Sequence, residues 1–207
     1  ATYNGALDVG GSEHRARLLM TTTFDGSGAT INKGTVTRVV CNNTLDVALA
    51  DNRAIIRTRH STKFDPARVS RELSQVAQGF QKYNAMCDAM ARVDMAADSV
   101  STFFKSCLDI PFDAKKDDIS GRKLGQFEAL RSAYADTVAE GTQAGTIWTA
   151  LNAITRYVDH DRSTRRTEST EDESRFASAQ FGSGADLKAK AWNLLIPEIK
   201  DKVLIAA

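Results

Sequence analysis

The feature that most constrains the fold is one long stretch of helical periodicity that begins near residue 65. Asp65-Pro66 is typical of a helix start, because proline fits the first helical position. Apolar residues then recur at spacings of three and four over about six turns, which predicts one long amphipathic helix. They are Val69, Leu73, Val76, Phe80, Tyr83, Met86 and Met90. We expect Gly79 to be a mild defect in it, costing about 1 kcal/mol relative to Ala.

Upstream of this helix the sequence favours strands. Residues 14–23 include three consecutive threonines, whose β-branched side chains favour extended structure. Residues 25–28 predict a turn and 35–40 resume the extended pattern, so we expect a hairpin. Residues 54–61 alternate between the two faces of a third strand. Residues 1–12 are polar and contain several glycines, and we expect a loop there.

Helical patterns dominate the rest of the chain. Further helices are expected over roughly 44–52, 100–108 and 124–139, and from Thr146 and Ser183 onward. The highly charged residues 161–175 are expected to form an exposed loop. Because strands come first and helices follow, we predict one α+β domain over residues 1–207. A small antiparallel sheet from the N-terminal third, residues 1–65, would pack against the mainly helical two-thirds, residues 66–207.

Composition limits the possible functions. Hydrophobic residues make up 42% and charged residues 26% of the chain, as in folded proteins with a real core. The net charge is +1, so only local clusters of charge can indicate a partner. The three cysteines contain no C-x-x-C pair, which argues against a disulfide framework and for a reducing compartment. We find no signal segment and no membrane-spanning run, and therefore expect a cytoplasmic protein without a membrane partner.

Five segments of the chain together resemble a known family. They are residues 5–7, 38–45, 56–61, 145–162 and 180–185. In this order they resemble the phage and plasmid protein family catalogued as domain of unknown function 932. The resemblance implies a location in the cytoplasm of a host cell and a genetic setting near recombination, single-strand-binding and anti-restriction genes. It implies no established activity.

Basic residues concentrate between Arg38 and Arg71. Seven basic residues stand against three acidic ones in this segment, and six of the seven are arginine. The guanidinium group donates in a planar fork that matches two phosphate oxygens, so such a cluster favours a polyanionic partner. The candidate binding residues from this segment are Arg38, Arg57, Arg59, His60 and Lys63.

Two pairs of arginines are expected to project from strands. Arg15 and Arg17 lie two residues apart, as do Arg57 and Arg59, so each pair points to one face of its strand. If the two strands are neighbours, four arginines share a sheet face, which would suit a nucleic acid. The alternative is a solvated sheet face with scattered ion pairs, which contribute little to stability.

A polar stripe on the helix that starts at Thr146 is a further candidate. Asn152, Arg156 and His160 follow one another at intervals of four, and Arg162 opens a basic run just beyond. Arg156 and Arg162 could contact phosphate, or the stripe could pack on the sheet through hydrogen bonds. Phe24, beside the hairpin turn, is a candidate for stacking on a base, with core packing as the alternative. Trp148 and Trp192 are expected in the core.

No residue pattern marks an enzyme active site. Cys41 and His60 could act as nucleophile and base, but no third orienting residue is evident. Residues 42–44 could hold a phosphate at a helix N-terminus or could simply cap the helix. His14, His60, His160 and the cysteines lack the spacing of a zinc site. We therefore expect no enzymatic activity, no cofactor and no bound metal.

Two classes of function remain. The first is a binder of single-stranded nucleic acid, expected to be DNA, that anneals strands in recombination and acts as a homo-oligomer. Phage annealing proteins offer an analogy at the level of fold, and such binding should weaken steeply with added salt. The second is a non-enzymatic protein-interaction module, for example an anti-defence or structural phage or plasmid protein.

Overall fold

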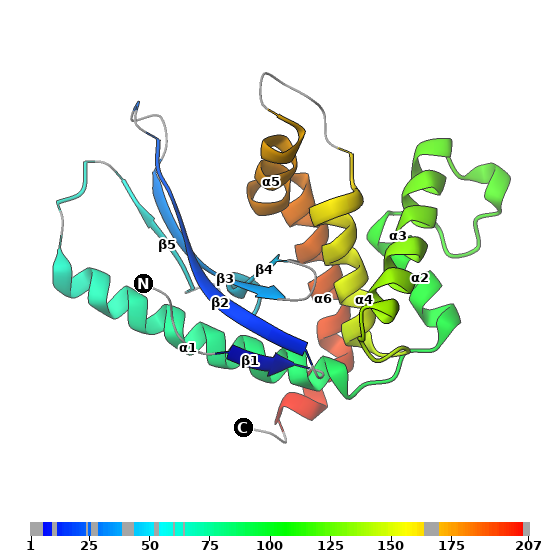
Figure 1. Ribbon diagram of the computed structural model, residues 1–207, viewed down its shortest axis with the longest axis horizontal. Coiled ribbons are helices and arrows are strands. Elements are labelled where there is room, and N and C mark those ends of the chain that lie inside the picture. The colour runs from blue at the N-terminus through cyan, green and yellow to red at the C-terminus, as the bar shows by residue number, and fades with distance from the viewer. Residues whose placement is uncertain are drawn as a thin grey trace.

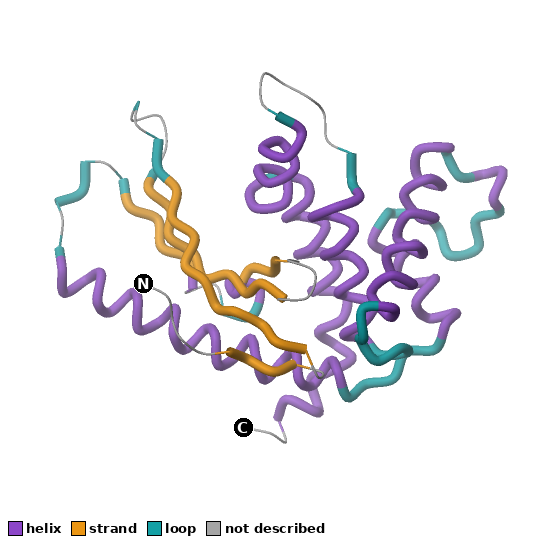
Figure 2. The backbone as a smooth tube through the Cα atoms, in the orientation of Figure 1, coloured by secondary structure: helices purple, strands orange, loops and turns teal. Residues whose placement is uncertain are grey.

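Strands occupy the first part of the chain and helices the rest (Figure 1). The computed structural model describes residues 6–9, 12–23, 25, 29–38, 44–51, 54–59, 61–63, 65–163 and 170–204. The fold is α+β, as predicted, with a small antiparallel sheet from the N-terminal third and a mainly helical remainder (Figure 2). Within those described ranges, no helix is both long enough and apolar enough to cross a bilayer.

Among the described residues, five antiparallel strands form one sheet. They are β1 (Ala6–Val9), β2 (Ser12–Thr21), β3 (Thr30–Arg38), β4 (Thr44–Asp46) and β5 (Ile55–Thr58). The central strand is β3, which pairs with β2 along one side and with both β4 and β5 along the other. The short strand β1 extends the sheet beyond β2.

Two local predictions for this part of the chain are wrong. The loop expected over residues 1–12 contains β1, which pairs with the start of β2. The helix expected over 44–52 is replaced by β4 and a 3-10 turn, η1 (Val47–Leu49), whose N-cap is Asp46. In both places hydrogen bonds to a neighbouring strand satisfy the backbone, and this non-local pairing overrides the local pattern.

The long helix α1 (Pro66–Ala91) confirms the main prediction from the sequence. Asp65 caps it by accepting hydrogen bonds from the backbone N–H groups of Ala67 and Arg68. The helix packs closely on the sheet and η1: a β-carbon at Gly79 would lie only 3.0 Å from Cβ of Ala54. Gly79 is therefore the residue that permits this close approach, and not merely a helix defect.

The helical part surrounds one central helix. Its elements are α2 (Ala97–Cys107), a 3-10 turn η3 (Lys116–Asp118), α3 (Gly121–Ala139), α4 (Ile147–Arg156), a π-helical turn η4 (Tyr157–Asp161), α5 (Glu171–Phe181) and α6 (Ser183–Leu204). Every residue of α4 from Ile147 to Thr155 is buried, so α4 forms the middle of this part. Trp148 and Trp192 are buried as predicted, and Trp192 stacks on Tyr83 of α1 with centroids 5.6 Å apart.

Helix α5 begins inside the segment 161–175 that was expected to be an exposed loop, so that expectation is wrong from Glu171 onward. A capping box starts it, in which Thr170 and Glu173 exchange hydrogen bonds between side chain and backbone. It then packs tightly on α6 and η4, because a β-carbon at Gly184 would lie 2.8 Å from Cγ1 of Val158 and 2.9 Å from the carbonyl oxygen of Ser178. This contact fixes α5 opposite the sheet.

Candidate nucleic-acid interface

The strand register shows which side chains share a face of the sheet. Residues that lie opposite each other in an antiparallel pair point to the same side. Arg15 lies opposite Thr37, Arg17 opposite Thr35, and Arg57 opposite Ile31. Residues 31, 35 and 37 of β3 are separated by even numbers of positions, so their side chains point to the same face of the sheet. The three arginines opposite them therefore project from that face as well. We call this surface, made by Arg15, Arg17 and Arg57, the arginine face.

The arginine face is the side of the sheet that α1 does not cover. Helix α1 packs on the opposite face, where Val36 is buried and a β-carbon at Gly34 would lie 3.1 Å from Cγ1 of Val76. The expectation that the two arginine-bearing strands are neighbours is wrong, since β3 lies between β2 and β5. Arg17 and Arg57 are thus about 10 Å apart across the strands and about 13 Å apart along them.

The arginines of this face are accessible. Arg17 and Arg57 are exposed, and within the described part of the chain neither forms an ion pair. Arg15 is also exposed, and its Nε donates to Oε1 of Glu13 at 3.2 Å. Ion pairs of this exposed kind contribute little and exchange readily with other partners. Guanidinium groups at these positions can therefore donate to an incoming anion.

Two further predicted residues follow β5. Arg59 and Lys63 are exposed, and neither pairs with a carboxylate of any described residue. His60 lies outside the described residues, as do Phe24, Cys41 and the Asn42-Asn43 segment. The positions of Arg59 and Lys63 extend the basic character of the surface past the end of β5.

An aromatic side chain from α5 lies over the centre of the arginine face. Lys33 of β3 stands between Leu19 of β2 and Ile55 of β5, on the same side of the sheet as the arginines. The ring of Phe181 covers it, with Nζ of Lys33 4.8 Å from the ring centroid. Phe181 remains 47% exposed, and Phe176, on the same helix, is 52% exposed.

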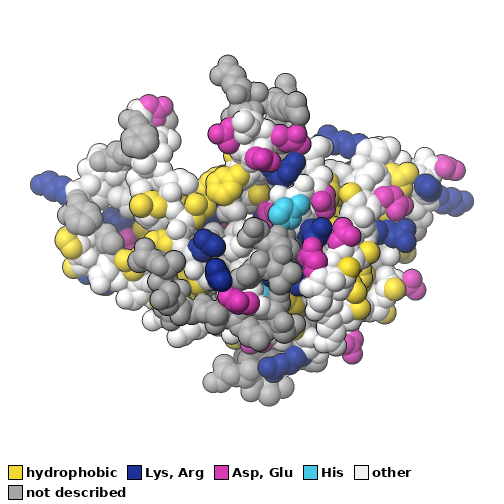
Figure 3. Space-filling view, viewed as in Figure 1, with side chains coloured by type: hydrophobic (Ala, Val, Ile, Leu, Met, Phe, Trp, Pro, Cys, Tyr) yellow, Lys and Arg dark blue, Asp and Glu magenta, His cyan; other side chains and the backbone are white. Residues whose placement is uncertain are grey.

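Sequence reasoning missed Phe181. The residue belongs to a segment that carried the family resemblance, but nothing local distinguishes a phenylalanine on the surface from one in the core. Figure 3 shows basic and hydrophobic side chains next to one another where the sheet faces α5. This side of the molecule thus combines exposed guanidinium groups with an exposed ring.

Lys33 itself is held in place beneath Phe181. Its ammonium group donates to Oδ2 of Asp46 and to the carbonyl oxygen of Gln180, both at 2.8 Å. The side chain is 4% exposed. Lys33 therefore joins the sheet to the end of α5, and its charge is already compensated.

A second buried lysine joins the same strands to α6. Nζ of Lys188 donates to Oδ1 of Asp159 at 2.5 Å and to the carbonyl oxygen of Thr44 at 2.7 Å, while Asp159 also accepts from the Thr44 N–H at 2.8 Å. Burial raises the pKa of Asp159 and lowers the pKa of Lys188, and each partner opposes the shift of the other. We call Lys33, Asp46, Lys188 and Asp159 the sheet–helix junction.

Two predicted binding residues are occupied inside the protein. Arg38 is 2% exposed, donates to Oγ1 of Thr142 at 2.6 Å and lies 3.8 Å from Glu140. Arg156 forms ion pairs with Glu140 and Asp136. The expectation that Arg38 contacts a nucleic acid is therefore wrong, because a buried guanidinium must be paired internally. The side chain of Arg156 is 20% exposed, and its contact with a nucleic acid stays a prediction. The ion pairs of both residues join the sheet and α4 to α3.

The remaining candidates on the α4 side belong to the helical part and not to a strand of the sheet. Arg162 is half-buried at the end of η4, where its backbone N–H donates to the carbonyl oxygen of Tyr157 at 2.7 Å. Asn152 is buried and donates to the carbonyl oxygen of Trp148 at 2.8 Å, whereas His160 is exposed. The polar stripe of α4 thus packs in the interior at Asn152, is half-buried at Arg156 and reaches the surface at His160.

The described thiols are not arranged for catalysis. Cys87 and Cys107 are buried, and burial raises the pKa of Cys107 to about 12. Such a thiol is almost entirely protonated at neutral pH and is a poor nucleophile. No group of three His, Cys, Asp or Glu side chains suited to a metal ion occurs among the residues whose placement is described.

A protein-family model described as Domain of unknown function (DUF932) matches residues 3–180. The chain belongs to this family. The match spans the whole sheet and ends one residue before Phe181, so it includes the arginine face and most of α5 in this family member. No curated protein and no solved structure matches the chain. The family description names no activity, and the functional argument therefore rests on the geometry.

Proposed function

We propose that this member of the family binds single-stranded DNA along the arginine face and promotes annealing in recombination, in the phage or plasmid setting that the resemblance implies. The observation that carries the proposal is the combination of three exposed arginines on one sheet face with an exposed phenylalanine ring between them. Proteins that bind single strands use this combination: cations follow the phosphates and aromatic rings stack on bases.

The proposed role of each side chain follows from its chemistry. Arg17 and Arg57 donate to phosphate oxygens from opposite sides of β3, and Arg59 and Lys63 extend the path beyond β5. Phe181 stacks on an unpaired base. A duplex keeps its bases stacked on each other and offers no free face to the ring, so this arrangement favours single strands. The basic side chains thus neutralise the phosphate backbone of the DNA, while most of its bases stay free to pair with a second strand.

Assembly into a homo-oligomer is part of the proposal. Within the described residues, β1 lies at one edge of the sheet, and β4 and β5 at the other. Unpaired strand edges are surfaces on which another chain can add by backbone hydrogen bonding. Gel filtration with and without a single-stranded oligonucleotide reports both properties, and a mass that stays monomeric in both runs contradicts assembly.

The direct test is a double substitution on the arginine face. We expect Arg17→Ala/Arg57→Ala to weaken binding of a fluorescent oligo-dT by about tenfold or more, since each charge-assisted hydrogen bond contributes roughly 1.5–3 kcal/mol. The matched control is Lys115→Ala/Lys116→Ala, which removes the same charge from exposed positions around η3. Fluorescence anisotropy gives the dissociation constants.

The control makes the outcome decisive. Equal weakening by both double variants would mean that net charge, and not the arginine face, governs binding. If Arg17→Ala/Arg57→Ala bound the oligonucleotide normally, the arginine face would not be the binding site. The alternative from the sequence is a protein-interaction module without DNA affinity. In that case the unsubstituted protein would show no salt-sensitive binding of the oligonucleotide.

A further inference from the structure

The outer edge of strand β2 is open over much of its length. Strand β1 pairs only with residues 12–15 of β2, whereas β3 pairs with residues 14–21 along the other side. Within the part of the chain that the structure describes, no strand lies along the outer side of residues 16–21. Figure 1 shows β1 beside the start of β2, and the rest of β2 continuing away from α2 and α3. We call residues 16–21 the open edge.

The open edge has a length and a composition that suit pairing with another strand. Six residues are a typical strand length. An edge strand presents unpaired backbone N–H and C=O groups, and proteins usually protect such an edge with Lys, Pro or a β-bulge. The open edge contains neither Lys nor Pro, and Arg17 is its only charged residue. Its register with β3 runs without interruption, so no bulge turns it away from a partner.

Two side chains of the open edge carry exposed apolar surface. Met20 is 68% exposed and Leu18 36%, and both point to the side of the sheet on which α1 packs. On β3, Gly34 lies opposite Leu18 and Asn32 opposite Met20, so neither side chain has an apolar neighbour across this pair of strands. Cross-strand contacts stabilise a sheet, and the burial of exposed apolar surface is favourable. A strand added at the open edge would supply both.

We propose that the open edge pairs with the open edge of a second copy of this chain. A twofold axis perpendicular to the sheet makes the two strands antiparallel, so each subunit uses the same surface. The sheet then continues from one subunit into the other, and the two arginine faces lie on the same side. The contact gives a surface to the assembly that is part of the proposed function, but it forms without DNA.

One register of this pair suits the side chains of the open edge. With Leu19 opposite Leu19 of the partner subunit, Leu18 lies opposite the partner's Met20, and Arg17 opposite the partner's Thr21. Residues that lie opposite each other point to the same side of the sheet. Leu18 and Met20 therefore cover each other on the α1 side, and Leu19 packs on its copy between the two arginine faces. No two like charges of the open edge stand directly opposite each other.

Other registers suit the open edge less well. A shift by one residue would turn the arginine face of one subunit to the side that carries α1 in the other. A shift by two would place Met20 opposite the partner's Ala16, or Leu18 opposite Thr22 of the partner subunit, and would cover less apolar surface. In the proposed register the two Arg17 residues are about 13 Å apart along the strands, so the partner subunit extends the cationic surface.

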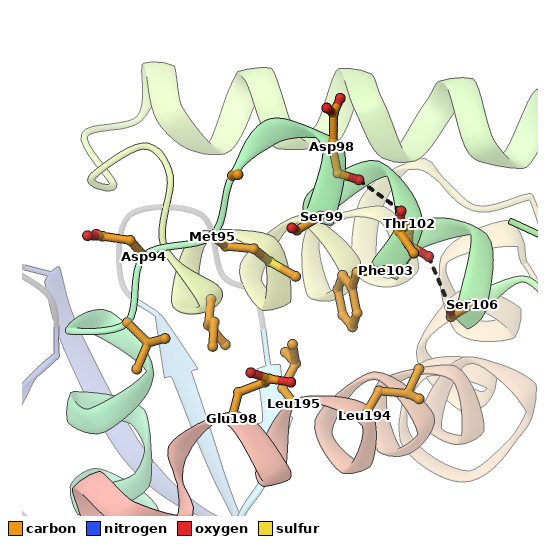
Figure 4. Close-up of a pocket in the computed structure, with 13 residues that line it drawn as sticks. Asp94, Met95, Asp98, Ser99, Thr102, Phe103, Ser106, Leu194, Leu195 and Glu198 are labelled. Carbon is orange, nitrogen blue, oxygen red and sulfur yellow. Dashed lines mark hydrogen bonds between the residues drawn. The ribbon is translucent and has the colours of Figure 1, made fainter.

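Sedimentation velocity of the protein without DNA tests the contact. We expect the unsubstituted protein to form a dimer, and Leu18→Lys/Met20→Lys to raise its dissociation constant by at least about tenfold, because lysines then lie opposite each other in two pairs. The matched control is Phe112→Lys/Leu194→Lys, which should dimerise like the unsubstituted protein. Phe112 and Leu194 are also exposed, and Figure 4 shows Leu194 on α6 beside the hollow between α2 and α6.

A charge reversal shows whether pairing of the two edges causes the loss. Leu18→Glu/Met20→Glu alone should also sediment as a monomer. An equal mixture with Leu18→Lys/Met20→Lys should form a heterodimer, since each lysine then lies opposite a glutamate. Recovery in the mixture also shows that both variants are folded. A mixture that stays monomeric, with both variants folded by circular dichroism, would contradict the contact.

Disulfide cross-linking tests the register. Leu19→Cys should form an intermolecular disulfide on mild oxidation, because the Cβ atoms of opposite residues are about 4.5–5.5 Å apart. Thr21→Cys is the control on the same face, since the two copies of residue 21 would be about 13 Å apart along the strands. The unsubstituted protein under the same oxidant gives the background of its own cysteines. Equal cross-linking of Leu19→Cys and Thr21→Cys would overturn the register.

The dimer and DNA binding can fail separately. Arg57→Ala changes β5 and not the open edge, so it should weaken binding of oligo-dT and still sediment as the dimer. The proposed contact is overturned if the unsubstituted protein is a monomer at every concentration, or if Leu18→Lys/Met20→Lys dimerises as tightly as Phe112→Lys/Leu194→Lys. Neither result would exclude DNA binding by the arginine face of a single subunit.

Discussion

Basic residues have different environments in two regions of this protein. On the arginine face, Arg17 and Arg57 are exposed, and no described carboxylate pairs with them. At the sheet–helix junction, Lys33 and Lys188 are buried, and each donates to a carboxylate and to a backbone carbonyl. One region leaves its charges exposed at the surface, and the other uses charge to join the sheet to the helices.

The difference shows why a count of basic residues says little about binding. Arg38 and Arg57 belong to the same positive segment of the sequence, yet Arg38 is 2% exposed and bonded to Thr142. A buried cation without a partner would cost several kcal/mol, so burial itself implies that its binding capacity is already used. Only the cations left at the surface can define a binding site.

The largest expected effect is at the junction. Lys188→Ala should lower the free energy of unfolding by about 3–5 kcal/mol, because it leaves the carboxylate of Asp159 buried without its ammonium partner. Urea unfolding followed by circular dichroism measures the loss. Arg57→Ala is the control and should change stability by less than about 0.5 kcal/mol.

A paired replacement sharpens this first comparison. Lys188→Met with Asp159→Leu removes both charges and should restore much of the lost stability, since an apolar pair needs no compensation. If Lys188→Ala and Arg57→Ala prove equally mild, the two regions do not differ in the way the contacts indicate.

The next largest expected effect is a different response of the two regions to salt. With about three phosphate contacts on the arginine face, affinity for a single strand should fall roughly 20-fold between 50 and 200 mM salt. The free energy of unfolding should change little over the same range, because the two lysines of the junction are buried and their ion pairs are poorly screened. Parallel anisotropy and urea titrations test this. An affinity that is insensitive to salt would contradict phosphate contacts altogether.

Features with a local signal could be predicted from the sequence. Asp65-Pro66 and the apolar stripe give α1, and the Thr146 cap gives α4. The period of two in β2 shows that Arg15 shares a face with Arg17. Features decided by distant partners could not be predicted. The register through β3 places Arg57 on that same face, and pairing with β3 turns residues 44–46 into a strand.

The same limit applies to the site. The sequence contains no sign that Arg38 is buried against Thr142, because the two residues come together only through packing. Phe181 was missed for the corresponding reason, since its position over Lys33 depends on the close contact between α5 and α6 at Gly184. Residue type indicates which side chains could bind a nucleic acid. Tertiary contacts determine which of these side chains are left exposed to do so.

A smaller effect is expected at the ring. Phe181→Ala should weaken binding of oligo-dT by at least about fivefold, because stacking on one base contributes roughly 1 kcal/mol or more. Phe112→Ala is the matched control, since Phe112 is 77% exposed on the connector after α2. Anisotropy titrations of both variants give the comparison. Equal losses would show that Phe181 has no particular role in binding.

The smallest expected effect concerns Arg15, which is intermediate between the two regions. Its guanidinium is exposed but already donates to Glu13, so Glu13 partly cancels its attraction for phosphate. Glu13→Gln should therefore raise the affinity for oligo-dT about two- to threefold, in line with the roughly 0.2–1 kcal/mol of exposed ion pairs. In the Arg15→Ala background the same change should lose most of its effect. If Glu13→Gln raised the affinity equally in both backgrounds, Glu13 would act through the net charge of the arginine face and not through its ion pair with Arg15.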